Sequence, residues 1–141
     1  MDEAALADFL RRDFPQVGED FVIEAVTEDG CDVRLKVEDR HLRPGGTVSG
    51  PSMFALADAG VYLAILARLG PVALAVTTNC SIDFMRKPAA NTDLIARTRL
   101  LKLGRVLAVG DVLIYSVGVD APVARASLTY SIPPGDLPRQ A

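Results

Sequence analysis

The sequence has no tryptophan, a single histidine and only two cysteines among its 141 residues. Cys31 and Cys80 show no metal-ligand spacing and no second pair, which argues against a zinc site and against a disulfide framework. We therefore expect two reduced thiols that serve packing, no bound metal, and a cytoplasmic protein.

The chain also has little excess charge and few aromatic residues. Its formal net charge is −3, and aromatic residues make up 6% of it. A nucleic-acid-binding protein needs a basic face that neutralises phosphates, so we expect no nucleic-acid partner.

Long hydrophobic runs are scarce as well. The longest apolar segment, Met53 to Ala67, has 15 residues and includes Asp58, which makes it too short and too charged for a membrane span. The first residues, MDEAALADFLRRDF, start acidic and predict an amphipathic helix rather than a secretory signal. Yet half of all residues are hydrophobic. In so small a chain, part of that surplus is expected to cover a subunit interface.

The pattern along the chain predicts one α+β domain over residues 1–141. A short helix is expected at 3–12, two strands about an Asp29-Gly30 turn, a Pro/Gly-rich loop at 40–50, and a long apolar helix at about 51–68. The second strand alternates through Val37 and Glu38. Four further strands are expected near 72–86, 92–103, 105–116 and 122–132, followed by a loose tail at 133–141. Hairpin connections favour an antiparallel sheet, and one long apolar helix favours a sheet that curls around it.

Three segments carry a resemblance to a known family. GTVSGPSMFALADAG, AVTTNCSIDFMRKP and LKLGRVLAVGDV resemble the hotdog-fold acyl-CoA thioesterases of the phenylacetate-degradation type, relatives of 4-hydroxybenzoyl-CoA thioesterase. The resemblance extends from about Val22 to Ile132. It implies the hotdog fold, an acyl-CoA or acyl-carrier thioester as substrate, no cofactor beyond the coenzyme A of the substrate, and a homodimer or dimer of dimers with interfacial active sites.

The resemblance also implies site residues. By position, Ser49-Gly50-Pro51 replace an H-G-G motif, and Asp58 occupies the place of the family's carboxylate. The loop HLRPGG lacks the Asn that relatives commonly carry near Arg43. A hydroxyl residue on the strand after the helix often helps to hold water, and Thr77 or Thr78 falls there.

Thioester hydrolysis requires donors for the carbonyl oxygen and an activated water or nucleophile for the carbonyl carbon. A helix N-terminus has unpaired N–H groups, so Gly50 N–H is the expected oxyanion donor, with Ser52 N–H as a second and Ser49 as the cap or a substrate contact. Asp58 is expected to act as base or nucleophile. It lies about 10 Å beyond Pro51 along the helix axis, so a second subunit would have to bring the two elements together. The alternative interpretation of Asp58 is a solvated residue on an exposed helix face.

Further residues are candidates for binding the substrate. Arg43 could contact the acyl group or form a surface ion pair, and basic residues at strand ends could bind coenzyme A phosphates or simply be solvated. These candidates are Arg86, Lys87, Lys102 and Arg105. Phe54, Tyr62 and Leu63 are expected to line the acyl pocket.

Two other functions remain open at this point. His41, beside the glycine loop, could serve a 3-hydroxyacyl thioester dehydratase or hydratase, or could be a structural loop residue. The missing H-G-G histidine and loop Asn also leave room for a non-catalytic acyl-thioester binding protein.

Overall fold

The structure, a computed structural model, describes residues 1–134. The prediction of a loose tail at 133–141 therefore lies almost wholly outside the described residues. Along the chain the elements are α1 (Glu3–Asp13), β1 (Phe21–Val26), β2 (Gly30–Leu35), the 3-10 helix η1 (Asp39–His41), α2 (Gly50–Leu69), β3 (Val76–Phe84), β4 (Leu94–Leu103), β5 (Leu107–Ser116) and β6 (Ala124–Ser131).

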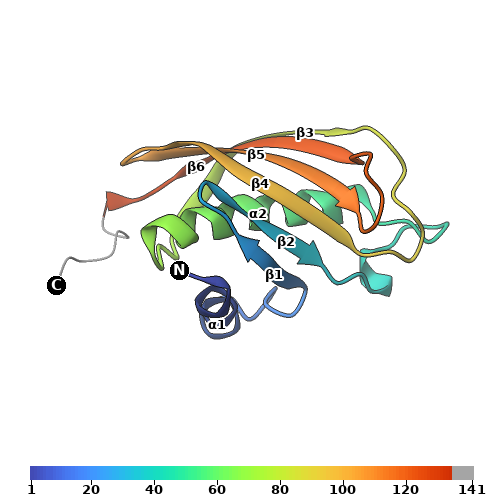
Figure 1. The fold of residues 1–141 in the computed structure, drawn as a ribbon, viewed down its shortest axis with the longest axis horizontal. Coiled ribbons are helices and arrows are strands. Elements are labelled where there is room, and N and C mark those ends of the chain that lie inside the picture. The colour runs from blue at the N-terminus through green and yellow to red at the C-terminus, as the bar shows by residue number, and fades with distance from the viewer. Residues whose placement is uncertain (135–141) are drawn as a thin grey trace.

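The strands of the described chain form one six-stranded sheet in the order β1-β2-β4-β5-β6-β3, with every neighbouring pair antiparallel. Figure 1 shows this sheet curving over α2. The chain leaves β2, passes through α2, and places β3 at the far edge beside β6. The predicted α+β hotdog architecture, a curled antiparallel sheet around one long apolar helix, is confirmed.

Helix α2 is the centre of the core. Ser49 caps it by accepting a hydrogen bond from Ser52 N–H, Pro51 occupies the first turn, and Gly70 ends it with a φ of 91°. Its buried residues occur all round the helix, because the sheet wraps it; they are Met53, Leu56, Ala57, Gly60 and residues 61–66.

The length of α2 corrects one expectation. The helix has 20 residues, and by length and composition alone it could cross a membrane. The sequence argument that the segment is too short for a span is therefore wrong. The feature that identifies α2 as a core helix is its burial against the sheet.

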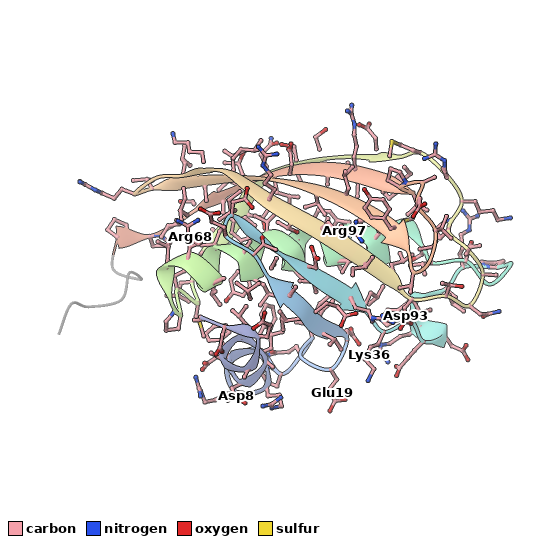
Figure 2. The ribbon with its side chains drawn as sticks, viewed as in Figure 1. Asp8, Glu19, Lys36, Arg68, Asp93 and Arg97 are labelled. Carbon is pink, nitrogen blue, oxygen red and sulfur yellow. The ribbon has the colours of Figure 1, made fainter. Side chains whose placement is uncertain are left out.

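Helix α1 packs on the same side of the sheet as α2, next to β1 (Figure 1). Asp2 caps it, and Leu6, Phe9 and Leu10 are buried, as their spacing predicted. Charged side chains such as Asp8 and, in the following loop, Glu19 point away from the molecule (Figure 2). Residues 14–20 then lead into β1 beneath α2.

The first hairpin differs from its prediction at both ends of β2. Gly30 belongs to the strand and not to the turn, because it pairs with Arg99 of β4. The position requires glycine, since a Cβ there would lie 1.8 Å from Thr98 O. The strand stops at Leu35 and does not continue to Val37 and Glu38. Beyond it, Lys36 N–H donates to Asp20 O, and Val37 N–H donates to the Asp93 carboxylate. These bonds replace the ladder partners that a longer strand would need.

The other strands are shorter than expected by a few residues. β3 begins at Val76 and not near 72, because Ala75 N–H bonds to Val72 O in a turn. The predicted hairpin at Gly104 is confirmed, with Gly104 N–H bonded to Leu107 O at 2.8 Å. Both cysteines are free thiols, Cys31 buried and Cys80 half-buried.

Candidate active site

Asp58 lies in the middle of α2 and is half-buried. Its Oδ1 atom accepts two hydroxyl hydrogen bonds, one from Thr77 Oγ1 on β3 at 2.5 Å and one from Tyr130 Oη on β6 at 2.7 Å. Thr77 and Tyr130 are register partners on adjacent strands, so the sheet presents both hydroxyls side by side to the helix. These contacts do not fit the alternative interpretation of Asp58 as a solvated residue on an exposed helix face. The carboxylate on α2 is held by side chains of two strands, β3 and β6.

Tyr130 is the site residue that the sequence reasoning did not select. Its side chain is buried, its ring packs against Tyr62 with centroids 6.2 Å apart, and burial together with the charge of Asp58 raises the pKa of its hydroxyl. Tyr130 therefore stays a neutral donor. One signal was available: the alternation of the last strand directed Tyr130 into the core, where a tyrosine hydroxyl requires a partner. The sequence could not show that this partner is Asp58.

Asp58, Thr77 and Tyr130 lie in the wall of a cavity of about 590 Å³. Most of the wall is apolar and comes from α1, β1, α2 and the start of β3. Its larger apolar residues are Leu10, Phe14, Val17, Phe21, Phe54 and Tyr62. Leu63 also lines it, so the cavity contains all three residues expected in the acyl pocket.

Thr78, the other hydroxyl candidate, is exposed on the opposite face of β3. Its hydroxyl donates to Thr129 O at 3.3 Å, and the register shifts between Thr77 and Asn79. Strand alternation thus separates the two threonines, and only Thr77 contacts Asp58.

A second cavity, of about 480 Å³, opens at the N-terminus of α2. Ser49 is the helix cap, as predicted, and the Ser52 N–H is bound to it. Among the residues described, the Gly50 N–H donates to no protein acceptor, which leaves it as the candidate oxyanion donor. The glycine has a structural reason too, because a Cβ at Gly50 would lie 3.3 Å from the Phe84 ring.

Three of the five predicted substrate-binding cations gather at this second cavity. Arg43, Arg86 and Lys87 line it and are exposed. Arg86 also donates to Pro122 O. Arg105 is not among its lining residues; with Lys102 it lies at the tip of the β4–β5 hairpin, at the other end of the sheet from the start of α2 (Figure 1).

His41 is held within its loop. Its Nδ1 atom accepts a hydrogen bond from Glu38 N–H at 2.9 Å, and its Nε2 atom lies 3.6 Å from Asp20 Oδ2. The imidazole is buried and does not line the Asp58 cavity. This geometry gives His41 a structural role.

The two catalytic candidates of one protomer lie in different cavities. Gly50 lines the cavity at the helix N-terminus, and Asp58 lines the apolar one. Eight residues of helix separate them by about 12 Å along the axis. One subunit therefore does not bring them to the same carbonyl group. Within residues 1–134, no three acidic, histidine or cysteine side chains form a group that could hold a metal ion.

Comparisons with known proteins indicate one superfamily. The family model of the thioesterase superfamily matches residues 45–122. A crystal structure from Silicibacter sp. TM1040, titled a "putative thioesterase", is 59% identical, covers 95% of this chain and 93% of its own, and superposes with a TM-score of 0.89. A "Putative esterase" from Pseudomonas aeruginosa is 30% identical over 72% of this chain and 74% of its own. A phenylacetic acid degradation protein from Thermus thermophilus (a point-mutant structure) is 27% identical, covers 83% of this chain and 97% of its own, and has a TM-score of 0.70.

Proposed function

Because this chain belongs to the thioesterase superfamily, we propose that it hydrolyses an acyl-CoA thioester with Asp58 as the reacting carboxylate. The observation that carries the proposal is the fixed carboxylate in the wall of an apolar cavity. Two hydroxyls bind Oδ1 and hold the group in one orientation. No other side chain of the described residues binds Oδ2, so this oxygen is available for chemistry.

Asp58 acts as general base or as nucleophile. As base, it takes a proton from water while the water oxygen attacks the carbonyl carbon; the carbon–sulfur bond then breaks, and the thiolate takes up a proton and leaves as the free thiol. As nucleophile, Oδ2 attacks the same carbon, the thiolate leaves, and water hydrolyses the resulting anhydride. Both routes need neither a metal nor a cofactor. A single turnover in isotopically labelled water identifies the nucleophilic route when label enters Asp58, which requires water to attack the Asp58 carbon of the anhydride and does not occur in the general-base route.

The negative oxygen of the tetrahedral intermediate needs a donor aimed at it. The Gly50 N–H, at the positive end of the α2 dipole, is the donor in this proposal. Since Gly50 and Asp58 of one protomer lie in separate cavities, the site combines the Gly50 of one subunit with the Asp58 of a second copy.

Two features support this second copy. β3 is an edge strand whose only partner in the described sheet is β6, and an unpaired edge favours pairing with another chain. Exposed apolar side chains follow this edge and the start of α2, where a partner would cover them. They include Val76 at 53% exposure, Phe84 at 52%, Met85 at 44% and Phe54 at 38%.

The cations around Gly50 support coenzyme A as the carrier. Arg43, Arg86 and Lys87 surround the cavity where the carbonyl group would be held, and phosphate groups are the anions that such side chains bind. An acyl-carrier protein offers one phosphate only, so coenzyme A is the better match. A cytoplasmic location, where acyl-CoA is found, is part of the same proposal.

The test is an assay of thiol release from a panel of acyl-CoAs. The wild type should release thiol, and Asp58→Asn should lose at least about a hundredfold in kcat, as loss of a general base does. Asp120→Asn, an exposed loop carboxylate outside both cavities, is the matched control and should keep the wild-type rate. Equal rates for wild type and Asp58→Asn would refute the mechanism.

The same panel tests the two other functions. Hydration of crotonyl-CoA that is lost in His41→Ala would favour the dehydratase. Tight binding of acyl-CoA without turnover of any panel member would favour a binding protein.

A further inference from the structure

The wall of the Asp58 cavity is almost free of polar groups away from its reacting end. Apart from Asp58, the one charged residue that lines it in the described part of the chain is Asp20. Its Oδ1 atom is paired with Arg40, and its Oδ2 atom faces His41 Nε2 at 3.6 Å. The Asp20 carboxylate is therefore already paired with Arg40 and His41. A second carboxylate inside the cavity would be buried without a partner and repelled by Asp58 and Asp20.

A row of aromatic rings leads away from the reacting end. The ring of Tyr130 packs on Tyr62 with centroids 6.2 Å apart, and Tyr62 contacts the edge of Phe14 with centroids 6.1 Å apart and planes at 87°. Tyr62 lies one helical turn beyond Asp58 on α2. Phe14, which follows α1, is thus connected through the Tyr62 ring to Tyr130, whose hydroxyl holds the Asp58 carboxylate.

Phe14 belongs to the cavity, whereas its neighbour on α1 does not. Phe14 and Leu10 line the cavity, and Phe14 keeps 38% of its surface exposed. Phe9 also contacts Tyr62, with centroids 6.3 Å apart, but it is 1% exposed and packs in the core outside the cavity. The same helix therefore offers a residue that limits the cavity and a residue that only anchors the helix.

We propose that Phe14, at the end of α1, sets the size limit of the acyl group, and that the substrates are thioesters whose acyl groups are apolar and uncharged. The inference rests on the proposed function in taking the cavity beside Asp58 as the acyl pocket. An acyl group that enters past Asp58 runs along Tyr62 and meets the Phe14 ring. Each methylene that stays buried strengthens binding about fourfold, and the gain stops where the ring blocks the chain.

The experiment measures binding separately from turnover. Dissociation constants of S-alkyl coenzyme A thioethers, which lack the carbonyl group that thioester hydrolysis requires, are determined by calorimetry for butyl, octyl, dodecyl and hexadecyl chains. In the wild type, affinity should rise with length and then level off. Phe14→Ala should move the levelling point to longer chains, with at least a tenfold gain for the longest thioether. Phe14→Trp should move it to shorter chains.

Phe9→Leu is the matched control, because it loosens α1 without changing the lining of the cavity. It should lower the melting temperature and leave the length profile unchanged. A carboxypropyl thioether should bind the wild type at least tenfold more weakly than the butyl compound.

Three results would overturn the inference: one length profile shared by the wild type, Phe14→Ala and Phe14→Trp; a shift in Phe9→Leu equal to that in Phe14→Ala; or equal binding of the carboxylated and apolar thioethers. Failure of the proposed function looks different. In that case no acyl-CoA is hydrolysed, while the thioether profiles still report on Phe14.

Discussion

Replacement of Tyr130 by phenylalanine tests the central arrangement of the site. The substitution removes one hydroxyl and keeps the ring that packs against Tyr62. The lost interactions are the 2.7 Å hydrogen bond to Asp58 Oδ1 and the longer one, at 3.1 Å, to the backbone oxygen of Asp58. A hydrogen bond to a charged group contributes about 1.5–3 kcal/mol. If the orientation of the carboxylate depends on this bond, the same free energy raises the barrier, and kcat falls roughly 10- to 150-fold. KM should change little, because the ring still lines the cavity.

Tyr62→Phe is the matched control. It removes a hydroxyl from the same cavity, but that hydroxyl donates to the backbone oxygen of Ala73 at 3.0 Å and not to the carboxylate. Its kcat should stay near wild type, with a loss of roughly 1 kcal/mol in the free energy of unfolding. Steady-state hydrolysis, followed by the loss of thioester absorbance, gives kcat and KM for both variants, and urea unfolding gives their stabilities.

The choice of assay pH follows from the neighbours of Asp58. The other titratable groups near Asp58 are Cys80 and Tyr130, and burial, with the charge of Asp58, raises the pKa of both. Neither group ionises near neutral pH, so kcat of the two variants can be compared at pH 7 without a change in the charge of these neighbours. Equal kcat in Tyr130→Phe and Tyr62→Phe would show that Tyr130 has only a packing role.

Further outcomes follow from other parts of the structure. Asp58→Asn and Gly50→Pro subunits, each inactive alone, should regain about a quarter of wild-type activity when they are mixed and allowed to exchange. Half of the resulting dimers are hybrids, and each hybrid contains one intact site out of two. No recovery in verified hybrid dimers would contradict a site shared between subunits. Thr98→Val should raise the free energy of unfolding by roughly 1 kcal/mol in urea titrations, since the buried Thr98 hydroxyl has no hydrogen-bond partner in the described chain; a destabilised variant would show that the hydroxyl is satisfied. Gly60→Ala should lower stability by about 1–3 kcal/mol, because its Cβ would lie 2.4 Å from Thr98 Oγ1, and Ala59→Gly on the same helix serves to measure the intrinsic helix effect. Burial raises the pKa of the Cys31 thiol from an ordinary 9.0 to about 12, so the folded state holds this proton more tightly than the unfolded state. Stability is therefore unaffected by this group below pH 9, and up to roughly 4 kcal/mol of it is lost as the pH rises from 9 to 12. The urea midpoint should fall over that interval in wild type and much less in Cys31→Ala; parallel curves would assign the alkaline loss to another group, such as Tyr130.

Much of the architecture was predictable because its signals are local. The long helix follows from the Ser49 cap, Pro51 and the apolar run to Gly70, all of which act within a few residues. The Gly104 hairpin and the inward alternation of β6 are equally local. The errors lie at strand ends, where distant groups decide. The end of β2 depends on Asp20 and Asp93, which take over the N–H groups of Lys36 and Val37.

For the site, residue type and position along the chain were sufficient to propose Asp58 and Gly50, and to limit the hydroxyl candidate to Thr77 or Thr78. The sequence pattern alone indicates a carboxylate within an apolar helix and a glycine at the start of that helix. Chain order could not separate Thr77 from Thr78, because a bulge and the strand register determine which hydroxyl faces α2. Nor could it connect Tyr130 to Asp58, 72 residues apart, or assign His41 to Asp20 and Glu38.

The amino-acid order was enough to specify the elements, the inward faces and the presence of a carboxylate in the core helix, because caps, turns and periodicity act over short distances. Folding in three dimensions was needed to show which groups meet. The sheet brings β3 and β6 together over α2, so that two hydroxyls converge on one oxygen of Asp58. It also places α1 beside Tyr62 and divides the two catalytic candidates between separate cavities. These relations depend on strand order and register, which pair residues far apart in the chain and leave no mark in its local pattern.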